Sequence, residues 1–133
     1  MEEDVIGRNK NLTKKEASML SPLQLAYIGD AVYELFIRRY LLQKKLPVHE
    51  LHKEAVKYVK AGAQANIIHF LEKELREEEK NIVKRGRNAK THSSPKNANI
   101  TDYKYATGFE ALIGFLYLTG QEERMFQLLN RII

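Results

Sequence analysis

The chain has 133 residues, of which 44% are hydrophobic, so it is long enough to bury the core of one ordinary domain and too short for two. It contains no cysteine, which excludes disulfides, zinc ribbons and cysteine nucleophiles. The net charge of +5 is a moderate excess, which fits a polyanionic partner without requiring one.

The amino-terminal end predicts neither secretion nor membrane insertion. Residues 1–4 are acidic, whereas a signal peptide begins with basic and then apolar residues. No apolar run approaches the length of a membrane span. We therefore expect a cytoplasmic protein without membrane attachment, with a flexible tail over residues 1–12 and a single domain over residues 13–133.

The first half of the chain predicts three helices. Ser21 is a candidate N-cap, Pro22 fits the first helical position, and Gln24 can reach back as in a capping box. This helix is expected to run to about residue 42. After Pro47, apolar residues continue at helical spacing from 48 to about 75, and Gly62 predicts a break into two helices.

The second half predicts three more helices around one loop. A short helix is expected over residues 77–85, and a loop over 86–99, where Gly, Ser, Pro, Asn and basic residues replace periodic apolar ones. Thr101 is a candidate cap for a helix that ends at Gly120, and residues 121–133 form a last amphipathic helix. Because alternating β-branched runs are absent from the sequence, the predicted fold class is all-α.

Two acids stand in almost wholly apolar helices. Glu110 is the only charged residue in the segment 105–118, at the edge of its apolar arc. In the segment 23–37 the only charges are Asp30 and Glu34, on a face that is expected to be core. An ionised carboxylate in such a place is costly unless a cation, a partner or a metal compensates it.

One such acid alone would fit a structural ion pair with Arg or Lys, or a helix turned towards water. Two such helices favour a shared site, because converging carboxylates form a hard oxygen site that suits Mg²⁺. The natural reaction is hydrolysis of a phosphodiester by a metal-activated water. Asp30 and Glu110 are therefore candidate catalytic and metal-binding residues. Gly29, inside the predicted helix, indicates close approach of another helix or a ligand.

Basic residues are concentrated in one segment. Between Lys80 and Lys104 lie seven basic residues and the single acid Asp102, a net charge of +6 that exceeds that of the whole chain. Such a segment can follow a phosphate backbone, although a solvated loop without function would have the same composition. Because no aromatic residue lies between positions 80 and 96, contact with a duplex backbone is favoured over stacking on unpaired bases. The candidate RNA-binding residues are Lys84, Arg85, Arg87, Asn88, Lys90 and Lys96.

Two motifs resemble those of ribonuclease III catalytic domains. Residues 27–32, Tyr-Ile-Gly-Asp-Ala-Val, resemble the signature Phe-Leu-Gly-Asp-Ala-Val, and residues 109–114, Phe-Glu-Ala-Leu-Ile-Gly, resemble the second acidic motif, in the same order. The chain is most similar to the bacterial Mini-ribonuclease III group, whose members consist of the catalytic domain alone. The similarity runs from about residue 23 to residue 129 and includes the segments 25–31, 51–53, 84–90 and 95–97.

The resemblance implies an all-helical homodimer that binds double-stranded RNA across both subunits, with one active site per strand. It implies Mg²⁺, with Mn²⁺ as a substitute, at Asp30 and Glu110. It also implies maturation of the 23S ribosomal RNA precursor. Recognition of A-form RNA by its shape, across the minor groove, agrees with these implications.

The chain departs from the wider ribonuclease III pattern at Leu23, Ala26 and Thr107, where larger relatives carry further acids. Fewer acids predict more water ligands on the metal and argue against a two-metal arrangement. Glu50 stands at a spacing that could supply one more acid. We expect no double-stranded RNA-binding domain after this one, so the basic segment is expected to supply the affinity.

Two alternative functions stay open at this point. The first is a fold of the same kind that has lost catalysis and only holds structured RNA. The second is a helical scaffold whose acids form structural ion pairs. Retention of Asp30 and Glu110 in apolar helices favours the enzyme over both.

Overall fold

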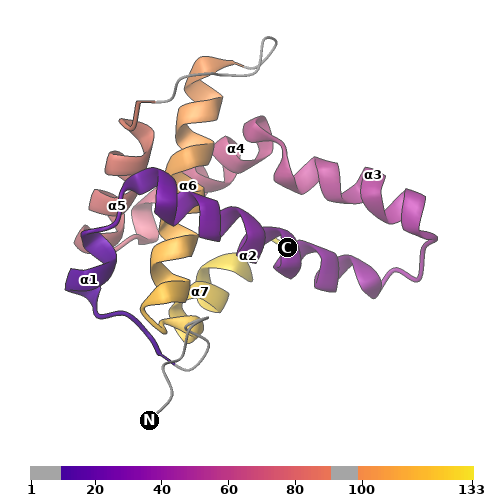
Figure 1. Cartoon of the computed structure of the whole chain (residues 1–133). Coiled ribbons are helices and arrows are strands. Elements are labelled where there is room, and N and C mark those ends of the chain that lie inside the picture. Colours follow the sequence, from indigo (N-terminus) through magenta and orange to yellow (C-terminus); the bar gives the residue numbers. More distant parts are fainter. Residues whose placement is uncertain (1–9, 91–98) are drawn as a thin grey trace.

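The computed structural model describes residues 10–90 and 99–133 (Figure 1). These residues form α-helices and one 3-10 helix, with no strand among them, which confirms the predicted all-α class. The elements are α1 (Lys14–Ser18), α2 (Pro22–Leu42), α3 (Val48–Val59), α4 (Ala61–Leu71), η1 (Glu72–Glu74), α5 (Glu77–Arg87), α6 (Ile100–Leu118) and α7 (Glu122–Leu129). Within the described part of the chain, no helix is both long enough and apolar enough to cross a membrane.

Capping boxes set the first two helix starts. At α2, the Gln24 amide donates to the Ser21 hydroxyl at 3.1 Å and the Ser21 amide donates to the Gln24 side chain at 2.9 Å, as predicted. Thr13 and Glu16 form a second box that starts α1, a helix that the sequence analysis did not assign. Just before it, the Leu12 amide donates to the carbonyl of Leu118 at 2.8 Å. The chain is therefore already held in place within the segment predicted to be a flexible tail.

The predicted break into two helices is confirmed, and one predicted helix start was wrong. The break predicted near Gly62 falls at Lys60, whose ψ of 154° is extended. The N-cap of α6 is Asn99, whose side chain accepts from the amides of Thr101 and Asp102, and not Thr101. In both cases a neighbouring residue satisfies the helix-end geometry, which periodicity alone locates only approximately.

Two further helices end at other residues than predicted, and part of the predicted loop lies outside the described residues. The helix predicted over residues 77–85 continues to Arg87, and the last helix ends at Leu129. Of the loop predicted over residues 86–99, residues 91–98 lie outside the described part of the chain.

Helix α6 is the central element of the fold. Figure 1 shows it running through the middle of the molecule, with α2 crossing it, and both α4 and α5 also pack against it. The hairpin of α2 and α3 extends to one side, away from α6. Ten residues of α6 are buried, among them Phe109, Leu112 and Leu116. A helix that is apolar on nearly every side fits this central place.

The crossing of α2 and α6 brings two backbones into direct contact. A Cβ placed on Gly29 would overlap the carbonyl oxygen of Glu110, and a Cβ placed on Gly114 would overlap the carbonyl oxygen of Leu25. This confirms the close approach that Gly29 predicted. Because no side chain separates the helices here, the residues next to the contact have fixed positions relative to each other.

Buried side chains fasten the end of α3 to its neighbours. The last carbonyls of a helix lack intrahelical partners. Here the Tyr33 hydroxyl of α2 donates to the Tyr58 carbonyl at 2.9 Å, and the Gln64 side chain of α4 donates to the Val59 carbonyl at 2.9 Å. The Tyr33 ring also packs edge-to-face on Phe109, with centroids 4.9 Å apart.

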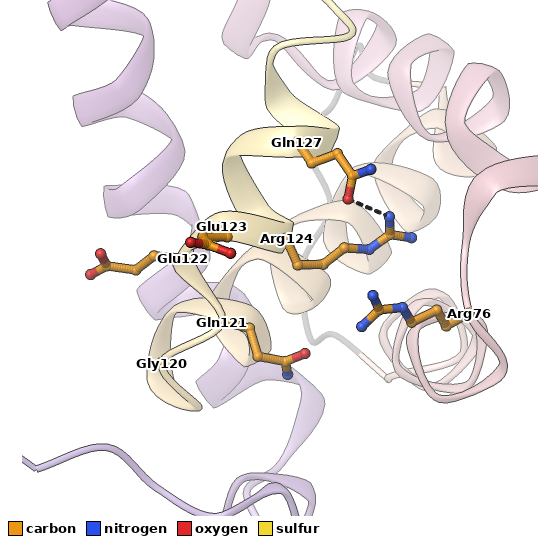
Figure 2. A pocket seen from close by; sticks show the side chains of 7 residues that line it. All are labelled: Arg76, Gly120, Gln121, Glu122, Glu123, Arg124 and Gln127. Atoms are coloured by element: carbon orange, nitrogen blue, oxygen red, sulfur yellow. Dashed lines mark hydrogen bonds between the residues drawn. The ribbon is translucent and has the colours of Figure 1, made fainter.

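A buried ion pair joins α5 to α7. The Arg124 guanidinium donates to both carboxylate oxygens of Glu79 at 2.8 Å, and the Arg76 amide adds a third hydrogen bond. Burial by itself raises the pKa of Glu79, but the hydrogen bonds from Arg124 and Arg76 outweigh burial and hold this pKa below its usual range. Arg124 also lines the hollow of about 730 Å³ in Figure 2, where Gln127 accepts another of its hydrogen bonds. The Arg124 guanidinium therefore has a structural role within the fold.

We expect Gly29→Ala to destabilise the fold by about 3 kcal/mol or more, because the added methyl group meets backbone that cannot rotate away. Gly62→Ala is the matched control. A Cβ there would lie 3.5 Å from the nearest atom, so this variant should gain about 0.5–1 kcal/mol from helix propensity. Urea unfolding measures the stability of both variants. Equal stabilities would show that α2 and α6 can move apart to accommodate a methyl group at position 29.

Candidate active site

Asp30 and Glu110 meet at the crossing of α2 and α6. Asp30 follows Gly29, the residue that touches the Glu110 backbone, so the close approach of the helices brings both carboxylates together. Burial, followed by the negative charge of Asp30 and a hydrogen bond with it, raises the pKa of Glu110 to about 8. We call these two residues the acid pair.

The members of the acid pair differ in exposure. Asp30 is exposed, whereas Glu110 is partly buried. Among residues 10–90 and 99–133, no ion pair joins either carboxylate to a basic side chain. Glu79, the other buried acid considered above, is held by an arginine. The scaffold alternative, in which Asp30 and Glu110 form structural ion pairs, therefore does not describe this site.

Gln64 is a neighbour of the acid pair that the sequence analysis missed. Its side-chain amide nitrogen lies 3.5 Å from Oε2 of Glu110 and lowers the pKa of that carboxyl against the larger effects of burial and Asp30. Its carbonyl oxygen Oε1 is buried and has no hydrogen-bond partner among the described residues. A polar residue in the apolar run 61–71 was the available signal, but it could not be linked to Glu110 without the fold.

The donor set of the acid pair fits a hard divalent cation. Two carboxylates lie together without a basic partner among the described residues, and burial, followed by the repulsion between the two acids, raises the pKa of Glu110. A cation that favours oxygen ligands would relieve this repulsion. The chemistry of these two carboxylates therefore fits Mg²⁺.

The remaining candidate acids are not part of the pair. The Glu50 carboxylate lies 3.3 Å from His49 and 3.9 Å from Lys53, both on α3. Glu34 lies 3.6 Å from Arg38 and acts on Glu110 only as a weak, more distant negative charge. Within the described residues, no group of three or more His, Asp or Glu side chains comes together as a metal site. The structure of the single chain therefore does not bring Glu50 together with Asp30 and Glu110.

The face of α2 that was expected to be core is buried only in part. Tyr33 and Ile37 are fully buried, but Tyr27 is 80% exposed and Leu23 is 41% exposed. The helix has two apolar faces, and Asp30 borders the exposed one. Periodicity could not distinguish them, because both are apolar.

The basic residues of the second half have different roles. Lys84, Asn88 and Lys90 are exposed. Arg87 donates to the Tyr105 hydroxyl at 3.0 Å, with its guanidinium 5.1 Å from the centre of that ring. Lys84 and Arg87 line a groove of about 410 Å³. We call it the basic groove; its lining residues are Glu72, Lys73, Leu75, Lys80, Val83, Lys84 and Arg87.

Arg85, which was predicted to contact RNA, makes hydrogen bonds within the fold. Its guanidinium donates to the carbonyls of Ser18 at 3.1 Å and Leu20 at 3.2 Å, next to the end of α1. These hydrogen bonds hold α1 against α5. Lys96 lies outside the described residues.

We expect the stability of the metal-free protein to fall as pH rises from about 4.5 to about 8. In this range the folded chain keeps a proton on Glu110 that the unfolded chain has lost, so deprotonation favours unfolding. Glu110→Gln should therefore stabilise the protein at pH 8, by about 1–3 kcal/mol, and change little at pH 4.5.

Urea unfolding in the presence of EDTA, at several pH values, measures this effect. Glu79→Gln is the matched control and should destabilise the fold at pH 8, by about 3–5 kcal/mol, because it breaks the buried pair with Arg124. If Glu110→Gln were also destabilising at pH 8, the site would not hold an uncompensated carboxylate.

Comparisons with known proteins agree with this geometry. The ribonuclease III domain matches residues 23–121. A Mini-ribonuclease 3 of Thermoanaerobacter sp. is 53% identical, over 98% of this chain and 94% of the relative. That of Clostridium tetani is 48% identical, over 93% of this chain and 83% of the relative.

A solved structure supports the same assignment. A protein of Fusobacterium nucleatum, known from an X-ray crystal structure, superposes with a TM-score of 0.80 at 38% sequence identity, over 85% of this chain and 93% of that one. The domain match includes both members of the acid pair and the helix crossing that brings them together. The chain therefore belongs to the ribonuclease III family, the endoribonucleases of double-stranded RNA.

Proposed function

We propose that this endoribonuclease cuts double-stranded RNA at the acid pair, with Mg²⁺, or Mn²⁺ in its place, held by Asp30 and Glu110. The observation that carries the proposal is the convergence of two carboxylates that have no basic partner among residues 10–90 and 99–133. When bound, the metal compensates both charges and activates a water for phosphodiester hydrolysis.

The residues of the pair have separate tasks. Asp30 is exposed, so its carboxylate lies on the side from which RNA approaches. Glu110 is recessed and contacts the Gln64 amide, so it anchors the site from the protein interior. With only two carboxylates, the other positions around the metal are left to water and to phosphate oxygens.

The acid pair would not help a protein that only binds RNA. The exposed carboxylate of Asp30 repels phosphate, and the partly buried Glu110 opposes folding as it loses its proton near neutral pH. Both effects are reversed when a cation is bound. The acid pair therefore favours the enzyme over the inactive RNA-binding module.

We assign RNA contact to the exposed part of the basic segment. Lys84, Asn88 and Lys90 project into solvent, and Arg87 is held in place by Tyr105 beside the basic groove. Such side chains can follow phosphates without reading sequence. Lys96 is proposed for the same role on the basis of its charge, and Arg85 is not.

We propose the 23S ribosomal RNA precursor as the substrate and the cytoplasm as the place of action. The proposal follows from the resemblance to the bacterial Mini-ribonuclease group, to which the relatives of Thermoanaerobacter and Clostridium belong. A transcript of the precursor stem is therefore the substrate of choice in the cleavage assays below.

We propose further that the chain forms a homodimer through the exposed apolar face of α2. This face carries apolar residues at four-residue intervals, positions 23, 27, 31 and 35, which places them on one side of the helix. Tyr27 is 80% exposed, Leu35 is 63% exposed and Leu42 is 64% exposed. Contiguous apolar surface of this kind marks protein contacts in soluble proteins.

Asp30→Asn and Glu110→Gln should each abolish cleavage of the 23S precursor stem, with kcat reduced by about 10³-fold or more. Binding of the duplex should persist in both variants, and Asp30→Asn should tighten it, because this change removes a negative charge near phosphate, whereas Glu110 already carries a proton when no metal is bound. Gel electrophoresis of end-labelled RNA with Mg²⁺ measures cleavage, and a shift assay with EDTA measures binding. Wild-type protein that binds the stem but never cuts it with Mg²⁺ or Mn²⁺ would disprove the proposed function.

Lys84→Gln combined with Lys90→Gln should weaken duplex binding for all sequences. The slope of log affinity against log salt concentration should decrease by roughly 2, about 1 for each phosphate that the variant no longer neutralises. Arg85→Gln is the matched control. It should lower the melting temperature, because the carbonyls of Ser18 and Leu20 lose their donor, and leave the slope unchanged. A smaller slope in Arg85→Gln, with an unchanged slope in the double lysine variant, would assign the RNA contact to Arg85 and not to Lys84 and Lys90.

Tyr27→Glu combined with Leu35→Glu should convert a dimer into a folded monomer, because charges then occupy the proposed apolar interface. Sedimentation velocity at micromolar concentration measures the state, with Phe70→Glu, an exposed apolar residue of α4, as the control that stays dimeric. A wild-type protein that sediments as a monomer would rule out this interface.

A further inference from the structure

Gln64 cannot touch RNA, yet it contacts the active site. It lies on α4 and is only 2% exposed, among side chains of the core. Its amide nitrogen Nε2 lies 2.9 Å from the Val59 carbonyl and 3.5 Å from Oε2 of Glu110. One buried amide thus connects the end of α3 with the recessed member of the acid pair.

The orientation of this amide is fixed by the Val59 carbonyl. A carbonyl only accepts hydrogen bonds, so the group that faces it must be the amide nitrogen. Exchanging Nε2 and Oε1 would place two carbonyl oxygens 2.9 Å apart and turn a second oxygen towards the Glu110 carboxylate. Both N–H groups of Gln64 are therefore assigned, one to Val59 and the other towards Glu110.

The same orientation leaves Oε1 without a partner among the described residues. Core packing does not require an amide here, since methionine has nearly the same length and shape without a buried unpaired oxygen. Capping Val59 accounts for one N–H group only. The remaining N–H group points to a role at Glu110.

We propose that Gln64 is a positioning residue of the active site, which holds one carboxylate oxygen of Glu110 from the buried side and leaves the other for the metal. This inference rests on the proposed function of the acid pair. Residues that hydrogen-bond a metal-ligating side chain orient it, and their loss weakens metal binding although they never touch the metal. Val59 anchors the arrangement, because its carbonyl belongs to the fixed junction of α3 and α4.

The test compares Mn²⁺ binding, followed by electron paramagnetic resonance in the absence of RNA, for the full chain and its variants. Gln64→Met should raise the dissociation constant of Mn²⁺ about tenfold or more relative to wild type. In cleavage assays the Mg²⁺ concentration for half-maximal rate should rise by a similar factor, while KM for RNA at saturating Mg²⁺ stays unchanged. High Mg²⁺ should restore kcat, because the variant still has both carboxylates.

Gln127→Met is the matched control, since Gln127 is an exposed glutamine that contacts Arg124 and no residue of the acid pair. It should bind Mn²⁺ as wild type does. If Gln64→Met does not fold, as judged by circular dichroism, Gln64→Asn replaces it. The asparagine keeps the amide but is one methylene too short to reach Val59 and Glu110 together, so the same weakening is expected.

Three results separate the inference from the proposed function. Wild-type affinity for Mn²⁺ in a folded Gln64 variant would overturn the positioning role and leave the acid pair intact. Loss of RNA binding, with unchanged Mn²⁺ affinity, would also overturn it. If the wild-type protein bound no Mn²⁺, or if Asp30→Asn and Glu110→Gln bound it equally well, the proposed function and the inference would fail together.

Discussion

The structure depends on the contact between the backbones of α2 and α6. Gly29 lies against the Glu110 carbonyl, and Gly114 lies against the Leu25 carbonyl, so the two longest helices cross with no side chain between them. Buried side chains of both helices belong to one core cluster, and the two acids stand directly beside the crossing. The same contact therefore joins two helices of the core and brings the carboxylates together.

Two buried acids in one small domain show how the surroundings determine the role of a carboxylate. Glu79 is fully buried, but Arg124 and the Arg76 amide satisfy it and keep its pKa low. Glu110 has no such donor of positive charge, and burial, followed by the negative charge of Asp30, raises its pKa to about 8. In the first arrangement, groups of the protein balance the charge of the carboxylate. In the second, a bound cation would be needed to balance it, which is the property expected of a metal site.

The sequence alone predicted the features that depend on the residues of one helix. It did not predict the contacts between side chains of different helices. Periodicity identified the helices and showed that Asp30 and Glu110 were unusual, and the residue order matched a known family. It misjudged the exposed face of α2, since Tyr27 is as apolar as the buried Tyr33. It grouped Arg85 with Arg87, although Arg85 binds carbonyls next to α1 and Arg87 binds a side chain of α6. Gln64 was missed because its function depends on a residue 46 positions away.

The packing around the helix crossing also limits how this site could be redesigned. Of the positions where larger relatives carry additional acids, Ala26 and Thr107 are each only 7% exposed, and the Thr107 hydroxyl donates to the Tyr103 carbonyl. A longer acidic side chain at either position would displace core atoms. Leu23 is 41% exposed and could accept glutamate without such displacement. Of these three positions, Leu23, at the first turn of α2, is therefore the one where the packing leaves room for a further acid.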